Sequence, residues 1–189
     1  AVARQFAKLQ PGCHLALLGR SLDASSRSHG SLLGVAERCE DLGAVATAFP
    51  VDHRSGEDTR DAIKTAIFHL GGIDVLVNNA SSMWTSPVAS PEKMDHLWSV
   101  NTRTTLVAIQ EAEAPLRMSK GSIVTMSPPL RMCNTEWIRQ HPAFTVSKYG
   151  MSIATLAAAS SGVRANCLWP RHFVATEATR ALEHTIPGA

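Results

Sequence analysis

The sequence lacks the features that mark several classes of protein. None of its apolar runs approaches the roughly 20 residues that a membrane-spanning helix needs, so we expect no transmembrane segment. It has no basic run, and its 18 lysine and arginine residues nearly balance 16 acidic ones. Such a charge pattern does not favour a nucleic acid or an acidic membrane as partner. A small-molecule partner fits this composition better.

Cysteine is also scarce: the four copies are Cys13, Cys39, Cys133 and Cys167. They are widely spaced, form no C-x-x-C pair and have no close histidine pair beside them, which argues against a zinc site and a disulfide framework. We therefore expect no metal ion, and reduced thiols in an intracellular protein. The ending HTIPGA is not a peroxisomal tripeptide, and because the N-terminus looks incomplete we expect the organelle address to be unreadable from this sequence.

What the sequence does contain is a regular alternation of two patterns. With 44% apolar residues it can bury one substantial core. Short apolar runs bounded by turn-forming residues predict strands at 13–19, 44–51, 73–77, 122–126 and 163–169. Apolar residues at three- and four-residue spacing predict helices at 31–42, 57–70, 91–113 and 143–160, and SPEK opens the third in the manner of a capping box. Strict alternation implies parallel strands with right-handed crossovers, so the expected fold class is α/β, a doubly wound parallel (Rossmann-like) sheet.

Polar and turn-forming residues follow every predicted strand. In open parallel sheets ligands bind beyond the carboxyl ends of the strands, so these exits are the candidate binding positions. The plain structural alternative is that turns favour Asn, Asp, Ser and Pro for backbone reasons alone. Five such exits at one edge of a sheet favour a binding site.

Several motifs stand in a characteristic order along the chain. VNNAS at 77–81, VNTR at 100–103, Ser127 after a strand and Lys148 in a helix resemble the short-chain dehydrogenase/reductase family, over nearly the whole chain. Within that family GGIDVLVNNAS, SPPL, KYGMS and LWP are similar to a hydroxysteroid dehydrogenase-like subfamily. The resemblance implies an oxidoreductase that interconverts carbonyl and alcohol groups of a small molecule with NADP. It also allows a homo-oligomer and a peroxisomal or mitochondrial location.

The resemblance assigns roles to four residues. In the family, the residue at Asn101 holds a water that leads protons to Lys148, Ser127 orients the substrate carbonyl, and position 144 carries the proton-donating tyrosine. Each has a plain alternative: a helical Asn on the surface, a serine that starts a turn, a solvated lysine. Lys148 lies one helical turn beyond position 144, so the two residues share a face.

Cofactor preference is indicated by Arg20 and Ser21 at the exit of the first strand. An arginine there accommodates a 2′-phosphate, which favours NADP over NAD, although Asp23 lies near enough to leave NAD open. The other cofactor-binding positions that the resemblance implies are Asp52 beside the adenine, Asn78, Ala80, Lys148, Pro170 and Thr176.

The chain departs from the family at position 144, where it has Phe144 in place of tyrosine. A phenyl ring cannot transfer a proton, and Tyr149, the single tyrosine, is rotated about 100° from the face shared by 144 and 148. Residues 1–12 match the helix that follows the family's first strand and glycine-rich turn. We therefore expect a single domain, 1–189, that lacks both, is shortened at the C-terminus and binds the cofactor weakly.

Three functional hypotheses follow. The first is an oxidoreductase with impaired catalysis. The second is a non-catalytic binding or interaction module, a pseudoenzyme that retains the fold. The third is a fragment without independent stability. The expected strand order is 44–51, 13–19, 73–77, 122–126, 163–169, with either a close approach or a cleft between the second and third strands.

Overall fold

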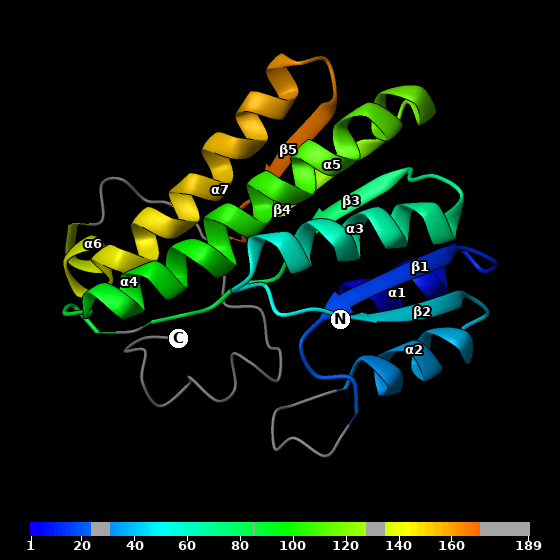
Figure 1. Cartoon of the computed structure of the whole chain (residues 1–189), viewed down its shortest axis with the longest axis horizontal. Coiled ribbons are helices and arrows are strands. Elements are labelled where there is room, and N and C mark those ends of the chain that lie inside the picture. The colour runs from blue at the N-terminus through cyan, green and yellow to red at the C-terminus, as the bar shows by residue number, and fades with distance from the viewer. Residues whose placement is uncertain (24–30, 85, 128–134, 171–189) are drawn as a thin grey trace.

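The computed structural model describes residues 1–23, 31–84, 86–127 and 135–170 (Figure 1). Its elements are α1 (Val2–Leu9), β1 (His14–Gly19), α2 (Leu32–Glu40), β2 (Val45–Pro50), α3 (Gly56–Leu70), β3 (Val75–Asn78), α4 (Pro91–Leu97), the π-helix η1 (Trp98–Arg103), α5 (Thr104–Ser119), β4 (Ser122–Met126), α6 (Thr135–Gln140), α7 (Pro142–Ser160) and β5 (Arg164–Leu168). All the predicted strands are present and their bounds agree to within two residues. The α/β class is therefore confirmed.

The strands form two parallel sheets. β1 pairs with β2, and β4 lies between β3 and β5. Each of these pairings is parallel and agrees with the predicted order. Within the described residues β1 and β3 are not hydrogen-bonded to each other, so the sheet is divided at the place where a close approach or a cleft was expected.

The β1–β2 sheet carries helices on both faces. Alternate residues of its strands, including Leu15 and Ala46, pack with Ala7 of α1 and Cys39 of α2 in one apolar cluster. Phe49 points to the other face, where its ring meets the ring of His69 on α3 edge-on with centroids 5.6 Å apart. Because successive side chains of a strand point to opposite faces of the sheet, one apolar run supplies side chains both to the face covered by α1 and α2 and to the face covered by α3.

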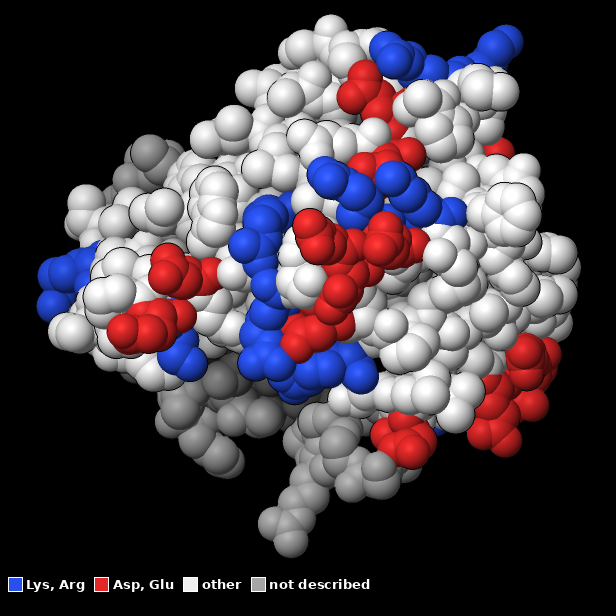
Figure 2. Space-filling view, viewed as in Figure 1, with Lys and Arg blue, Asp and Glu red and all other residues white. Residues whose placement is uncertain are grey.

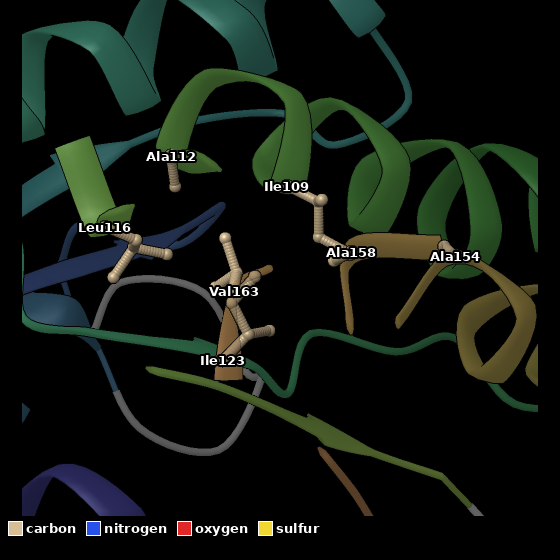
Figure 3. Close-up of a cluster of buried hydrophobic side chains, with 7 residues drawn as sticks. All are labelled: Ile109, Ala112, Leu116, Ile123, Ala154, Ala158 and Val163. Carbon is tan, nitrogen blue, oxygen red and sulfur yellow. The ribbon is translucent and has the colours of Figure 1, made fainter. Parts of the chain in front are cut away.

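A second apolar core joins α5 and α7 to the β3–β4–β5 sheet. Figure 3 shows its side chains, from α5, β4, α7 and the residue before β5, directed toward one another: Ile109, Ala112, Leu116, Ile123, Ala154, Ala158 and Val163. The helix residues recur at three- and four-residue spacing, so each helix presents one apolar face. This packing fixes α7, the helix that bears Lys148, against the sheet.

The helix predicted over 91–113 is in fact three segments, α4, η1 and α5, and the last runs on to Ser119. Its opening was predicted correctly: the Ser90 side chain accepts a hydrogen bond from the Lys93 backbone N–H at 3.3 Å. The π-helical turn spans Asn101, and Thr104 Oγ1 donates back across it to the Ser99 carbonyl at 3.0 Å. Periodicity alone does not distinguish this wider turn from an α-helix.

Charged side chains of both signs intermingle on the face formed by α3 and α5 (Figure 2). Glu111 of α5 pairs with Arg60 at 2.8 Å and with Lys64 at 3.8 Å, both on α3. This face therefore carries paired charge.

The described residues contain no helix with the length and apolar character that a membrane span requires. They also contain no group of three or more His, Cys, Asp or Glu side chains that could hold a metal ion.

Candidate functional site

The arrowheads of the strands in both sheets point toward the same side of the molecule (Figure 1). The segments that follow them therefore lie at one edge, as expected for parallel strands. α4, η1 and the first turns of α7 lie close to this edge. Apart from Pro170 and Thr176, which come after β5 in the sequence, the predicted site residues fall into two groups. One group comes from β3, β4 and the segments that follow them, and the other comes after β1 and β2.

Lys148 is the centre of the first group. The side chain is 5% exposed, and Nζ donates to the Met126 carbonyl at the end of β4, 2.7 Å away. Nζ also lies 3.5 Å from the hydroxyl of Ser81, which follows β3. Burial lowers the pKa of this lysine from 10.5 to about 8. Lys148 is thus a buried amine with a lowered pKa, held between the end of β4 and the segment that follows β3.

This shift predicts a specific pH dependence of stability. Since the folded-state pKa lies below that of the unfolded chain, the free energy of unfolding should rise between about pH 8 and about pH 10.5, where only the unfolded chain keeps the proton. The rise should be about 3 kcal/mol at most. Urea unfolding of the wild type and Lys148→Met across this range measures it, and Lys148→Met should lose the rise. Lys64→Met, on an exposed helix face, is the control and should keep it.

Asn101 is fully buried on η1 and connects three segments. Its Oδ1 accepts from the Ser82 N–H at 2.7 Å, and its Nδ2 donates to the Ser82 carbonyl at 2.9 Å. The same Nδ2 donates to Ser147 Oγ of α7 at 2.8 Å, and that hydroxyl donates to the Phe144 carbonyl at 2.8 Å. The alternative of an exposed helical asparagine is therefore wrong: this amide joins η1, the segment after β3 and α7.

Ser127 directly follows β4, and its buried hydroxyl lies 2.9 Å from the hydroxyl of Ser152. Ser152 stands four residues beyond Lys148, and Phe144 stands four residues before it, so the three residues belong to one face of α7. The Phe144 ring is 4% exposed. Hydroxyl groups therefore lie near Lys148, and position 144 itself offers only a hydrocarbon ring.

Asn78 is the buried last residue of β3, and Ala80 lies two residues beyond it. Asn78 Nδ2 donates to Thr125 Oγ1 on β4 at 3.3 Å, so its side chain links the end of β3 to the neighbouring strand. Thr155 of α7 donates to the same Thr125 hydroxyl at 2.7 Å. The exit of β3 is thereby tied through β4 to the helix that carries Lys148.

The second group lies after β1 and β2. Asp52 forms an ion pair with Arg54, 2.5 Å between Oδ2 and Nη2, and hydrogen bonds from Arg54 are the main reason that the pKa of Asp52 is lowered to about 2. The charge of Arg20 also lowers this pKa, so Arg20 and Asp52 share one electrostatic environment. Arg20 is exposed at the exit of β1, and Ser21 accepts the Leu32 N–H at 2.9 Å through its carbonyl oxygen.

The structure thus places nearly all the predicted positions at one edge. Pro170 is half-buried just after β5, and Thr176 lies outside the described residues. Sequence reasoning missed Ser81, Ser82, Ser147, Ser152 and His96, which hydrogen-bond the predicted residues or one another. The four-residue spacing of Ser152 from Lys148 was the available signal for one of them. The other contacts join segments that are distant in sequence, so no spacing or periodicity in the sequence could have predicted them.

Comparison with known proteins gives a consistent result. The family model for short chain dehydrogenases matches residues 10–186. Hydroxysteroid dehydrogenase-like protein 2 of Mus musculus is 35% identical over 184 residues, 94% of this chain and 37% of that protein. A putative dehydrogenase from Xanthomonas campestris superposes with a TM-score of 0.86 at 31% identity, covering 100% of this chain and 69% of that one. L-sorbose reductase from Gluconobacter frateurii, in complex with NADPH and L-sorbose, has a TM-score of 0.79 at 22% identity and shares the fold over 97% of this chain and 68% of its own.

The chain spans less than half of the length of the curated relatives it matches, 37% of the mouse protein and 43% of the human one. The match nevertheless runs through both groups of site residues.

Proposed function

The chain belongs to the short-chain dehydrogenase family, and on this premise we propose that it is built to bind NADP(H) and to interconvert carbonyl and alcohol groups of a small molecule, with catalysis impaired at position 144. The observation that carries the proposal is the buried Lys148, whose Nζ meets the Ser81 hydroxyl after β3 and the carbonyl of Met126, the residue before Ser127, at the end of β4. We assign the catalytic positions to Asn101, Ser127, Phe144 and Lys148.

The donor groups at this edge suit a dinucleotide. Arg20 supplies a cation for a 2′-phosphate, Asp52 an acceptor for an adenine amino group, and Lys148 a cation inside the site. Asn78 ends β3 and Ala80 lies two residues beyond it, where a small residue permits close approach of a flat ring. A bound nicotinamide would supply or accept the hydride.

The catalytic positions of this chain have separate roles toward the substrate. Ser127 would hold the substrate carbonyl through its hydroxyl, which Ser152 orients at 2.9 Å. Lys148 would raise the local positive potential and hold a proton at Nζ. Asn101 keeps Ser82 and Ser147 in place. Phe144 provides no proton, so the final protonation of the alcohol oxygen has no side-chain donor at that position.

A second candidate function is a non-catalytic binding or interaction protein. The buried Phe144 ring favours it, because the phenyl group packs at the position of the proton donor and leaves the rest of the site in order. Exposed apolar side chains on α7, Val146, Ile153 and Leu156, support a homo-oligomer in either case. Cofactor binding without turnover distinguishes this function from the first.

Cofactor titration tests the shared part of both candidates. We expect weak binding, with NADPH preferred over NADH, because Arg20 at the exit of β1 carries a charge suited to a 2′-phosphate. Fluorescence titration of the purified protein measures both dissociation constants. Arg20→Gln should weaken NADPH binding about tenfold, typical of one lost charge-assisted contact, and leave NADH binding nearly unchanged. The exposed Arg139 of α6, changed to Gln, is the matched control. Submicromolar NADH binding by the wild type would contradict the proposed preference.

A further inference from the structure

The segment that follows β3, residues 79–84, is fastened at Ser82 from two sides. Asn101 holds the main chain of Ser82 through both its N–H and its carbonyl, at 2.7 and 2.9 Å. The Ser82 hydroxyl forms a third hydrogen bond, 2.9 Å long, with Nε2 of His96 on α4. Two helical segments, η1 and α4, thus hold one residue by separate groups.

Ser82 is connected to Lys148 through its neighbour in the sequence, Ser81. The Ser81 hydroxyl lies 3.5 Å from Lys148 Nζ and 3.4 Å from the Ser82 carbonyl oxygen, to which it donates. Because Ser81 and Ser82 are adjacent, a displacement of Ser82 carries the Ser81 hydroxyl with it. The contact between the Ser81 hydroxyl and Lys148 therefore depends on where residues 79–84 lie.

His96 is suited to hold a hydroxyl at neutral pH. Its ring is half-buried, and burial is the largest cause that lowers its pKa. The charges of Lys93, Arg54 and Arg20 lower the pKa further, whereas Asp52 opposes them. The ring is accordingly neutral at pH 7, with one nitrogen that donates and one that accepts, and a serine hydroxyl can meet either at Nε2.

We propose that His96 is a positioning residue of the candidate site, which acts through the Ser82 hydroxyl to hold residues 79–84 in place and keep the Ser81 hydroxyl on Lys148. The proposal deepens the proposed function and rests on it for the role of Lys148 toward a bound cofactor. The contacts that it invokes are present in the described residues whether or not the protein turns over a substrate.

The test is the reactivity of Lys148 in the whole chain without cofactor. Trace acetylation with acetic anhydride at a series of pH values, read by peptide mass spectrometry, gives the titration midpoint of each lysine. We expect His96→Ala to raise the midpoint of Lys148 by about one unit, a tenfold change in the protonation equilibrium, because water reaches the amine when the segment loosens. His96→Gln keeps a polar nitrogen near the position of Nε2 and should restore most of the wild-type midpoint.

Ser82→Ala removes the same bond from the other partner, so it should shift the midpoint as His96→Ala does, and the double variant should shift it no further. His69→Ala is the matched control. The Nε2 atom of His69 also forms a hydrogen bond with a hydroxyl, that of Thr47 at 3.1 Å, but neither residue belongs to the candidate site. It should leave Lys148 unchanged. An unchanged midpoint in His96→Ala, additive shifts in the double variant, or no restoration by His96→Gln would overturn the proposal. Failure of NADPH to bind would count against the proposed function only, because no cofactor enters this measurement.

Discussion

Replacement of Phe144 by tyrosine is expected to raise the rate of NADPH-dependent carbonyl reduction by about 10² to 10⁴, the usual contribution of a positioned general acid. The new hydroxyl would stand on the face of α7 that carries Lys148, one turn away, in a site where Ser127 and Ser152 already form a hydroxyl pair. The buried cation would lower the phenol pKa and favour proton transfer near neutral pH. Initial rates with a panel of small carbonyl compounds measure the gain.

The gain requires a bound nicotinamide, so cofactor binding is measured on the same samples. Phe68→Tyr, which adds a hydroxyl to a ring 88% exposed on α3, is the matched control and should not change the rate. The double variant Phe144→Tyr with Lys148→Met should lose most of the gain, because the new phenol then has no cation beside it. Equal turnover by the wild type and the Phe144→Tyr variant would show that the proton donor lies elsewhere.

Gly150→Ala is expected to destabilise the fold by about 1 to 3 kcal/mol, as overpacking of a close contact typically does. A Cβ at this position would lie 2.5 Å from both Cγ2 and Oγ1 of Thr102 on η1, far inside van der Waals contact. Thr102 Oγ1 donates to the Ser147 carbonyl at 2.8 Å, so α7 and η1 cannot separate without straining that bond. The melting temperature should fall by about 2 to 12 °C for a domain of this size.

The same substitution should disturb the site. Asn101 and Ser147 meet across the α7–η1 contact at 2.8 Å, and a forced separation would loosen this bond. Gly56→Ala is the control, since its Cβ would meet Arg103 only at an ordinary 3.5 Å and alanine suits the first turn of α3. A thermal melt of Gly150→Ala that coincides with the wild type would contradict the close packing of these helices.

Local information determined the elements and the order of the chemistry along the chain. Short apolar runs predicted each strand, because a strand buried on both faces needs apolar side chains at successive positions. The spacing of Phe144 and Lys148 placed both on one face, because a helix repeats every 3.6 residues. Ser90 marked the start of α4, because its hydroxyl can accept a free backbone N–H of the first turn.

Tertiary structure alone decided how these parts act on one another. The partners of Asn101 stand 19 and 46 residues away, and no periodicity in the sequence encodes contacts at such separations. The low pKa of Lys148 comes from burial, which exists only once α7 lies over the ends of β3 and β4. The contact of His96 with Ser82 and the wider turn of η1 were likewise decided by the tertiary structure. Residue types and their spacing are local properties of the chain, whereas desolvation and hydrogen bonds between distant segments arise only from packing.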